Sequence, residues 1–375
     1  MPTPLRLVPV LVATLLLAGP SSAQPNSPPG DADDPLRLAV AGMVHGHVHG
    51  FLSARPYDGV EVVGVAEADT ALLRRRADQY DIAPDRRYHT LEAMLEATRP
   101  DALVAFTHTY DHRRVVETAA PYGVDVMVEK PLAVNMEHAR AIRAAARQHN
   151  IHVLTNYETT WYPSTRRAHE IARTDQRLGP LRKVIVRDGH RGPKEIGVGP
   201  AFLEWLTDPT LNGGGALTDF GCYGANLLTR LMNGQRPLSV TAITQQLKSD
   251  PVYRRVDDVA TILLTYPGAQ GIIQASWNWP FSRKDLSIYG QAGYVHADDA
   301  THMRLRLRGE DEQSLTLASE PPFYESAVPY LKRVVRGEAE PDGLSSLANN
   351  MIVTEILDAA RRSARTGQAV QLRDE

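Results

Sequence analysis

The stretch Leu36-Arg-Leu-Ala-Val-Ala-Gly-Met-Val-His-Gly-His-Val-His-Gly50 joins a short apolar run to a glycine-rich turn and to helix-like sequence. A buried strand that passes through a glycine turn into a helix is typical of the first unit of a dinucleotide-binding sheet. When Gly42 is aligned with the first glycine of G-x-G-x-x-G, Val44 and His47 stand where the other two glycines belong. Those glycines allow close approach to the pyrophosphate, so we expect cofactor contacts that are looser or differently arranged.

Strand and helix patterns alternate after this first unit. Strands are expected at residues 60–67, 101–107, 124–128 and 151–156, and helices at 71–80, 90–97, 110–122 and 136–149. This alternation predicts an α/β fold with a doubly wound parallel sheet, the Rossmann arrangement, in a domain that spans residues 36–155. Ligands of such sheets bind at the carboxyl ends of the strands.

From residue 156 onward the pattern changes to closely spaced strands. Apolar runs lie at 181–187, 238–246, 259–266, 270–277 and 284–289. They predict a C-terminal α+β domain, residues 156–375, with a mostly antiparallel open sheet. We expect this domain to bind substrate and to carry oligomer contacts. Helices expected at 329–335 and 345–366 would pack back on the first domain.

Glu67 stands at the end of the second expected strand, near the ~20-residue distance from Gly42 at which an acidic residue contacts the ribose 2′-hydroxyl. A carboxylate at this place repels a 2′-phosphate. The sequence therefore favours NAD over NADP. Two alternatives remain open: Glu67 ends a strand in water, or the neighbouring Asp69 takes the ribose contact.

Two further motifs carry chemistry. Val128-Glu-Lys-Pro-Leu-Ala133 follows a strand directly, and Gly213-Gly-Gly-Ala-Leu-Thr-Asp-Phe-Gly-Cys-Tyr-Gly-Ala-Asn226 joins three glycines to a helical pattern. Asp219, Tyr223 and Asn226 recur at helical intervals, so one face of one helix would present all three. The alternative is a glycine-rich loop that caps an ordinary amphipathic helix.

Together, the EKP motif and the pattern GGGxLxDxGxYxxN resemble the Gfo/Idh/MocA family of nicotinamide-dependent sugar and polyol oxidoreductases, over residues 36–372. The tyrosine at position 223 is similar to the branch that includes glucose-fructose oxidoreductase and dihydrodiol dehydrogenase. The resemblance implies hydride transfer between a secondary alcohol and NAD(P), a carbohydrate substrate, and a dimer or tetramer.

Within this frame Tyr223 is the expected acid/base, because a nearby ammonium, Lys130, lowers the phenol pKa from about 10. Asp219 is expected to orient Lys130 or a sugar hydroxyl. Substrate contacts are expected from Trp161, Arg166 and Asn226. The residues expected to face the cofactor are Gly42, Val44, His45, Glu67, His112, Glu129 and Lys130.

The histidines raise the question of a metal. His45 and His49 are four residues apart, as are His108 and His112, and both pairs follow expected strands. Paired histidines on one helical face can bind a metal. We expect no metal site, because no carboxylate or cysteine completes a familiar ligand pattern in the sequence. Structural or substrate-contact roles are favoured instead.

The composition excludes some partners. A net charge of -3 gives no basic surplus for nucleic acid binding. Cys222 is the only cysteine, so no intrachain disulfide can form, and we expect it to pack in the interior.

The N-terminus has the pattern of a secretory signal. Arg6 precedes the apolar run at residues 7–19, and small residues follow at 21–23. Residues 1–23 are therefore expected to be a cleaved Sec-type signal peptide, and residues 24–35 a flexible linker. An uncleaved anchor is the alternative, although the apolar run is short for a membrane span. We therefore expect the mature protein to be exported to the periplasm with no membrane attachment. Free NAD is scarce outside the cytoplasm, so a freely exchanging cofactor would be hard to supply there.

Three functions remain open at this point. The first is an NAD-dependent sugar or polyol oxidoreductase. The second is a redox-neutral glycoside hydrolase that keeps NAD bound and works through a transient keto-sugar. The third is a sugar-binding protein without cofactor, suggested by Val44 and His47 in the damaged fingerprint.

Overall fold

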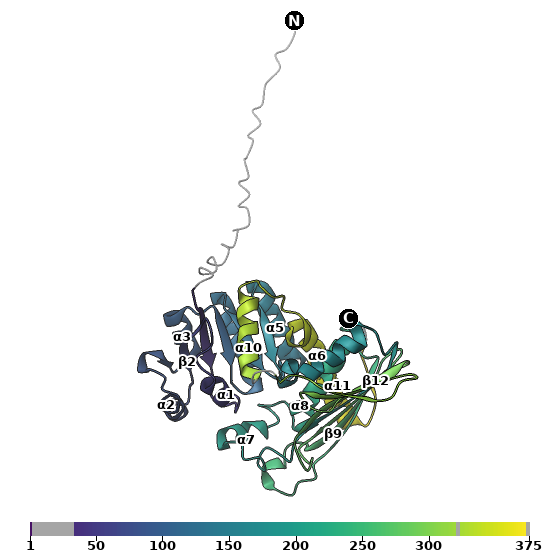
Figure 1. The fold of residues 1–375 in the computed structure, drawn as a ribbon. Helices are drawn as coiled ribbons and strands as arrows, with labels where there is room; N and C mark the ends of the chain where they lie inside the picture. The colour runs from purple at the N-terminus through teal and green to yellow at the C-terminus, as the bar shows by residue number, and fades with distance from the viewer. Residues whose placement is uncertain (2–33, 320–322, 373–375) are drawn as a thin grey trace.

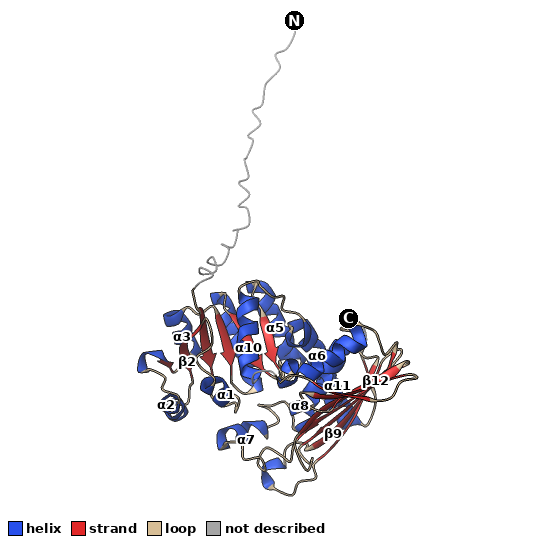
Figure 2. Ribbon diagram, viewed as in Figure 1, coloured by secondary structure: helices blue, strands red, loops and turns tan. Residues whose placement is uncertain are grey.

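The computed structural model describes residue 1 and residues 34–319 and 323–372. The expected signal peptide and most of the expected linker lie outside these residues. Two sheets organise the described chain, and helices pack on each of them (Figures 1 and 2).

The first sheet has six parallel strands in the order β3-β2-β1-β4-β5-β6. Its strands are β1 (Leu36–Ala41), β2 (Val60–Ala66), β3 (Arg87–Tyr88), β4 (Ala102–Ala105), β5 (Asp125–Glu129) and β6 (Val153–Asn156). Its helices are α1 (Val48–Ser53), α2 (Thr70–Gln79), α3 (Leu91–Thr98), α4 (His112–Ala119) and α5 (Met136–His149). The strand order reverses between β1 and β4, which is where such sheets bind ligands. The predicted doubly wound sheet is confirmed.

Each face of this sheet has its own core. Residues of α3, α4 and α5 share one apolar cluster with alternate residues of the strands. Residues of α1 and α2 share the other cluster, and they are joined there by α10 (Phe323–Val335), a helix from late in the chain. Figure 1 shows α10 lying on the first sheet.

The second sheet has nine strands in the order β14-β13-β12-β11-β7-β10-β9-β8-β15. They are β7 (Leu181–Gly189), β8 (Ser239–Gln245), β9 (Val259–Thr265), β10 (Gln270–Ser276), β11 (Arg283–Gly290), β12 (Gly293–Ala297), β13 (His302–Leu307), β14 (Gln313–Thr316) and β15 (Val370–Gln371). Among the pairings that the described strands make within this second sheet, only the β7 and β10 pair is parallel. The predicted mostly antiparallel sheet is confirmed, and four of its strands, β12 to β15, were not anticipated.

Helices cover one face of the second sheet. The helices of this part of the chain are α6 (Pro163–His169), α7 (Pro200–Leu206), α8 (Ala216–Asp219), α9 (Gly221–Leu231) and α11 (Leu347–Thr366). A large apolar cluster joins α9 and α11 to the strands. Close packing is possible because Gly224 of α9 faces Ile273, where an added Cβ would lie 2.5 Å from the Ile273 Cγ2 atom.

Two details differ from expectation. The glycine-rich motif does not form one helix, because a break at Phe220 separates α8 from α9. The helix predicted at residues 329–335 begins earlier, at Phe323. It packs on the first domain as expected, so the fold unit around the first sheet includes residues from beyond the expected boundary at 155.

Candidate active site

A cleft of about 1030 Å³ opens at the carboxyl edge of the first sheet. The turn after β1, the residue after β5, helix α7 and the α8–α9 junction all contribute to its wall. Figure 1 shows α7 below α1, and α8 to the right of α1. Among its lining residues are Val44, His45, Gly46, His47, His49, Lys130, His190, Phe202, Asp219, Phe220, Tyr223 and Lys284. Segments far apart in sequence, including both predicted motifs, therefore meet at one place.

Lys130 follows β5 directly, and its ammonium forms a buried ion pair with the Asp219 carboxylate. Lys130 Nζ also donates to the Asp219 carbonyl oxygen at 3.1 Å, and Trp277 Nε1 donates to Asp219 Oδ2 at 2.9 Å. Burial disfavours both charges, but each partner more than offsets it: the pKa of Lys130 is raised and the pKa of Asp219 is lowered. Both groups are therefore charged at neutral pH, and Asp219 orients Lys130.

Tyr223 lies beside two ammonium groups. Lys130 Nζ is 5.2 Å and Lys284 Nζ is 4.9 Å from the centre of its ring. The expectation that Lys130 lowers the phenol pKa is nevertheless wrong for this arrangement. Burial, followed by the Glu158 and Asp188 carboxylates, raises the pKa of Tyr223 well above 10. The charge of Lys130 is neutralised by Asp219, so Tyr223 keeps its proton at neutral pH.

Sequence reasoning missed several groups around the tyrosine. Lys284 of β11 pairs with Glu158, and the Asp188 carboxylate at the end of β7 is 1% exposed. Neither Asp188 oxygen has a hydrogen-bond partner among the described residues, and burial raises its pKa well above 3.8. Burial lowers the pKa of His190 to about 4. Asp188 and His190 stand at the end of β7, whereas Lys284 lies in β11 almost 100 residues later, so no local pattern could have identified the group.

Asn226 does not face the cleft. Its side chain is fully buried, and Nδ2 donates to the Leu344 carbonyl oxygen at 2.8 Å and to Asn350 Oδ1 at 3.3 Å. The predicted substrate contact is corrected to a structural bond that ties α9 to the start of α11. The break at Phe220 is one reason, because it ends the single helix that would have aligned Asn226 with Asp219.

Trp161 and Arg166 are not among the cleft-lining residues either. Trp161 Nε1 donates to Asn156 Oδ1 at 3.0 Å, and its ring packs on Tyr330 of α10. Arg166 lies on α6, which packs against β12. The expected substrate contacts are therefore corrected: Trp161 joins the crossover after β6 to α10 on the first sheet, whereas Arg166 belongs to a helix on the second sheet, and neither residue lines the cleft.

The turn after β1 keeps the first glycine of a dinucleotide fingerprint, whereas Val44 and His47 occupy the positions of the other two glycines. Gly42 has φ +76°, and a Cβ there would lie 2.6 Å from Thr107 Cγ2, so this position requires glycine. From the second domain, α7 covers the turn: Trp205 Nε1 donates to the Val44 carbonyl oxygen at 3.4 Å. The Phe202 ring is 4.8 Å from the ring of His45.

Glu67 lies beside the turn and lines a smaller cavity of about 110 Å³ together with Gly42, Val44 and Thr107. Its carboxylate accepts the Met43 and Asp69 backbone N–H groups at 2.8 and 3.0 Å. At 9% exposure it is not a solvated strand end. Asp69 caps α2 through the Ala71 and Leu72 N–H groups, so Glu67 is the better placed of the two for a ribose.

The histidine pairs separate in space. His49 hydrogen-bonds Tyr80, whereas His45 is buried and His47 contacts Glu129. His112 Nδ1 lies 3.1 Å from the Pro131 carbonyl oxygen and supports the loop that carries Lys130. Burial lowers the pKa of His112 to about 4, so its ring is neutral and Nδ1–H donates. The cis bond between Lys130 and Pro131 lies in this loop.

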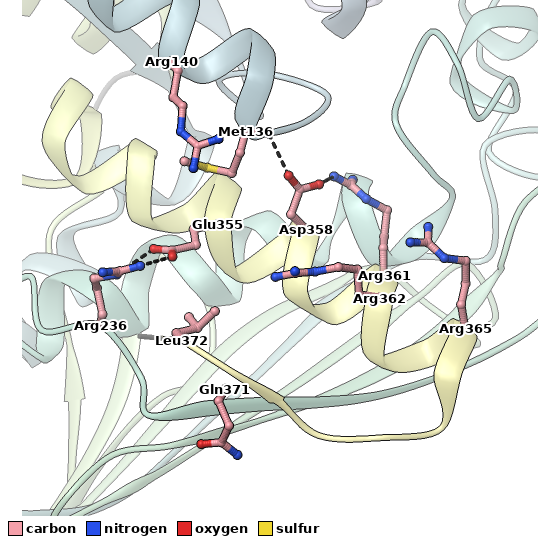
Figure 3. A pocket seen from close by; sticks show the side chains of 10 residues that line it. All are labelled: Met136, Arg140, Arg236, Glu355, Asp358, Arg361, Arg362, Arg365, Gln371 and Leu372. Atoms are coloured by element: carbon pink, nitrogen blue, oxygen red, sulfur yellow. Dashed lines mark hydrogen bonds and ion pairs between the residues drawn. The ribbon is translucent and has the colours of Figure 1, made fainter. Parts of the chain in front are cut away.

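A second cavity, of about 520 Å³, lies between α5 and α11 and contains none of these residues. Figure 3 shows arginines around it, with Arg236 paired to Glu355 and Arg361 paired to Asp358. Asp358 also accepts the Met136 backbone N–H at 2.7 Å, which joins the two domains. This cavity lacks a tyrosine–lysine pair, so the cleft is the candidate active site.

No described helix is both long and apolar enough to cross a bilayer. Several curated proteins are similar to this chain along most of its length. Trans-1,2-dihydrobenzene-1,2-diol dehydrogenase of Sus scrofa is 24% identical over 87% of this chain and 95% of its own. D-apiose dehydrogenase of Paraburkholderia graminis is 26% identical over 87% of this chain and 86% of its own.

Solved structures share the fold. Aldose-aldose oxidoreductase from Caulobacter crescentus, complexed with glycerol, has a TM-score of 0.76 at 24% identity and covers 90% of this chain and 100% of its own. An inositol dehydrogenase homologue from Azotobacter vinelandii, complexed with NAD+, has a TM-score of 0.78 at 20% identity and covers 90% of this chain and 98% of its own.

Two family descriptions match consecutive parts of the chain. Residues 36–157 match the oxidoreductase family with an NAD-binding Rossmann fold, and residues 165–296 match the GFO/IDH/MocA C-terminal domain. The predicted cofactor, NAD, is thereby supported, and the alternative of a protein without cofactor is set aside. With the fingerprint turn, the buried Lys130–Asp219 pair and both matches in place, the chain belongs to the Gfo/Idh/MocA family of oxidoreductases, with an NAD-binding Rossmann domain.

Proposed function

We propose that this protein transfers hydride between a secondary alcohol of a sugar or polyol and NAD, with Tyr223 as the acid/base and Lys130 as its partner. The observation that carries the proposal is the meeting of Lys130, Asp219 and Tyr223 on one wall of the cleft, at the carboxyl edge of the NAD-binding sheet. NAD, when bound, supplies the hydride acceptor or donor.

The residues divide the work as follows. The Lys130 ammonium, held by Asp219, donates hydrogen bonds to the reacting oxygen, and Tyr223 exchanges the proton with it. Because burial raises the phenol pKa, Tyr223 is protonated at neutral pH and acts directly as a proton donor when a ketone is reduced. In the oxidative direction the two ammonium groups stabilise the transient phenolate, and oxidation is expected to speed up as the pH rises above neutral.

The substrate class rests on two supports. Curated relatives are dehydrogenases of a sugar and of a diol, and one structural neighbour is an aldose oxidoreductase. The cleft is lined by ammonium, imidazole and carboxylate groups, which suit a ligand with several hydroxyls. We expect Glu67 to accept the ribose 2′-hydroxyl, which favours NAD over NADP.

The decisive experiment compares variants in NAD binding and in NADH-linked turnover of a panel of aldoses, inositols and diols. Tyr223→Phe is expected to retain NAD binding and to lose about 10² to 10⁴ in kcat. Lys130→Met should lose turnover as well. The matched control is Tyr266→Phe, since Tyr266 is a buried tyrosine that does not line the cleft. Full turnover by Tyr223→Phe would refute the assignment.

A redox-neutral glycoside hydrolase is the second candidate. The cleft carries more proton-transfer groups than hydride transfer needs, notably Lys284 and His190. In this cycle a ring hydroxyl is oxidised, and the ketone acidifies the neighbouring C–H. Loss of that proton expels the glycosidic oxygen, which takes up a proton; water then adds to the alkene, and hydride returns to the ketone. Release of free aglycone without net NADH would favour this cycle, whereas stoichiometric NADH would exclude it.

We also propose export through residues 1–23 and assembly into a dimer or tetramer through the second sheet. Ile243 and Leu247 support an apolar contact there, being 68% and 60% exposed. N-terminal sequencing of protein recovered from cell fractions tests the first point, and an intact N-terminus in the cytoplasmic fraction would contradict it. Light scattering with Ile243→Lys tests the second, which a monomeric wild type would contradict.

A further inference from the structure

Two histidines and one glutamate converge on the wall of the cleft. His45 and His47 lie in the turn after β1, and Glu129 is the last residue of β5. One ligand atom from each residue lies within 4.8 Å of the other two. The sheet topology explains the meeting, because β1 and β5 both pair with β4 and all three strands end at the same edge.

The expectation of no metal rests on the sequence pattern, in which no carboxylate or cysteine completes a familiar ligand spacing with the histidines. Glu129 stands 82 residues from His47, yet His47 Nδ1 lies 3.0 Å from Glu129 Oε2. The rings of His45 and His47 are edge to face, with centres 4.5 Å apart. Two imidazoles and one carboxylate form the ligand set of catalytic zinc sites and of other divalent transition-metal sites that keep open positions.

Neighbouring groups hold these ligands in place. Asn156 Nδ2 donates to Glu129 Oε1 at 3.2 Å, and Trp161 Nε1 in turn orients Asn156. The His47 backbone N–H donates to His45 Nδ1 at 3.1 Å, which holds the His45 ring beside His47; a metal ion bound at this nitrogen would replace that hydrogen bond. Oriented outer groups of this kind are a general feature of metal sites.

Charge and exposure also suit a cation. The nearby Lys130 ammonium is paired with Asp219, so its positive charge is compensated. The Glu129 carboxylate contacts His47 and supplies the negative charge of the cluster. His45 is 2% and Glu129 is 2% exposed, whereas the His47 side chain is 27% exposed. His45 and His47 line the cleft, so open coordination positions would face it.

We propose that His45, His47 and Glu129 bind one divalent transition-metal ion, such as Zn²⁺, on the wall of the cleft, with its open positions turned toward the ligand. The ion takes the place of the proton shared between His47 and Glu129. His47 stands where the third fingerprint glycine would be, so the same replacement supplies one of the ligands. The bound ion would take a hydroxyl or carbonyl oxygen of a ligand at its open positions. The proposal does not depend on the proposed function.

The test measures metal directly. Purified protein is stripped with a chelator, dialysed and titrated with Zn²⁺ by calorimetry, and the reloaded protein is assayed for metal by mass spectrometry. We expect one bound equivalent. His47→Ala and Glu129→Gln should weaken binding by at least about 100-fold, and Asn156→Ala by about 10-fold to 100-fold, as for outer groups elsewhere.

The matched control is His49→Ala, because His49 lines the same cleft but bonds Tyr80 outside the cluster. This variant should bind Zn²⁺ like the wild type. If His47→Ala fails to fold, the melting temperature provides the same comparison. Zn²⁺ should raise the melting temperature of the wild type and leave that of Glu129→Gln unchanged. No stoichiometric uptake, or equal uptake by wild type and ligand variants, would overturn the proposal.

Discussion

At the scale of single residues, the buried pair of Lys130 and Asp219 dominates the site. Two charges removed from water are costly, and here each is compensated by the other and by Trp277. A buried ion pair need not stabilise the fold more than apolar residues would. Because the pair lies in the cleft at the carboxyl edge of the NAD-binding sheet, we infer that its role is catalytic rather than stabilising.

Breaking this pair should be costly and non-additive. Lys130→Met and Asp219→Asn are each expected to lower the free energy of unfolding by about 3 to 5 kcal/mol, because each leaves a buried charge unpaired. The double variant should lose less than the sum. Urea unfolding of the four proteins measures the coupling. In the control Asp298→Asn, which breaks a half-exposed pair with Arg304, the loss should stay below about 1 kcal/mol. If the losses at Lys130 and Asp219 were strictly additive, the two side chains would not form an energetically coupled ion pair.

His190 should make stability depend on pH. Burial lowers its pKa to about 4, below the ordinary value of 6.5. The unfolded chain therefore binds a proton that the native state refuses, so this contribution is complete above about pH 6.5 and is lost as the pH falls to about 4. His190→Gln should flatten the pH dependence of unfolding over this window by about 3 kcal/mol. Parallel curves for variant and wild type would show that His190 is not responsible.

At the scale of elements, the conformation of the turn between β1 and α1 depends on its own glycine and on a helix of the second domain. Gly42 adopts a positive φ against Thr107, and α7 of the second domain covers the following residues. The turn is thus shaped by the second domain as well as by its own glycines. This explains how Val44 and His47 can replace two fingerprint glycines without loss of the NAD-binding fold.

Gly42→Ala should disturb both stability and NAD binding. The new Cβ would meet Thr107 Cγ2 at 2.6 Å and the Thr107 backbone nitrogen at 2.9 Å, in addition to backbone strain. We expect a loss of about 1 to 3 kcal/mol in unfolding free energy and weaker NAD binding, followed by fluorescence titration. The control Gly309→Ala has a similar φ of +84° and no neighbouring atom within 4 Å, so it isolates the backbone strain. Equal effects in both variants would dismiss the contact with Thr107.

At the scale of the whole molecule, the chain crosses between its two sheets more than once. Helix α10 belongs to the core of the first sheet, although the NAD-binding family match ends at residue 157. Helix α11 packs on α9 and β8 of the second domain and also on α5 of the first. Segments from the end of the chain therefore pack on both domains and tie them together.

Leu331→Ala tests this interlocking. Leu331 of α10 is fully buried in the apolar cluster of the first sheet. Its truncation should lower the free energy of unfolding by about 2 to 5 kcal/mol and should speed hydrogen exchange in β1 and α1, which hydrogen-exchange mass spectrometry resolves. The control is Leu305→Ala, which truncates a leucine in the core of the second sheet and should leave exchange in β1 and α1 unchanged. Faster exchange confined to the second sheet in Leu331→Ala would contradict the packing.

The sequence by itself determined the elements and the family. Apolar runs, turns and helical periodicity are local, so β1 and α5 could be predicted from their own residues, and the two motifs pointed to NAD and to an alcohol substrate. The same reasoning failed at Asn226, because helical spacing says nothing about a break at Phe220. It also missed β12 to β15, whose short strands depend on pairing with neighbours.

Only the tertiary structure decided which charged groups meet. Asp188 at the end of β7 and Lys284 of β11 reach the tyrosine from separate strands of the second domain, and Glu129 reaches His47 across the first sheet. Protonation depends on burial and on every neighbouring charge, which is why the phenol pKa rises where the Lys130 motif alone predicted a fall. Spacing along the chain can nominate residues for a site, but distance and burial in the folded chain determine their chemistry.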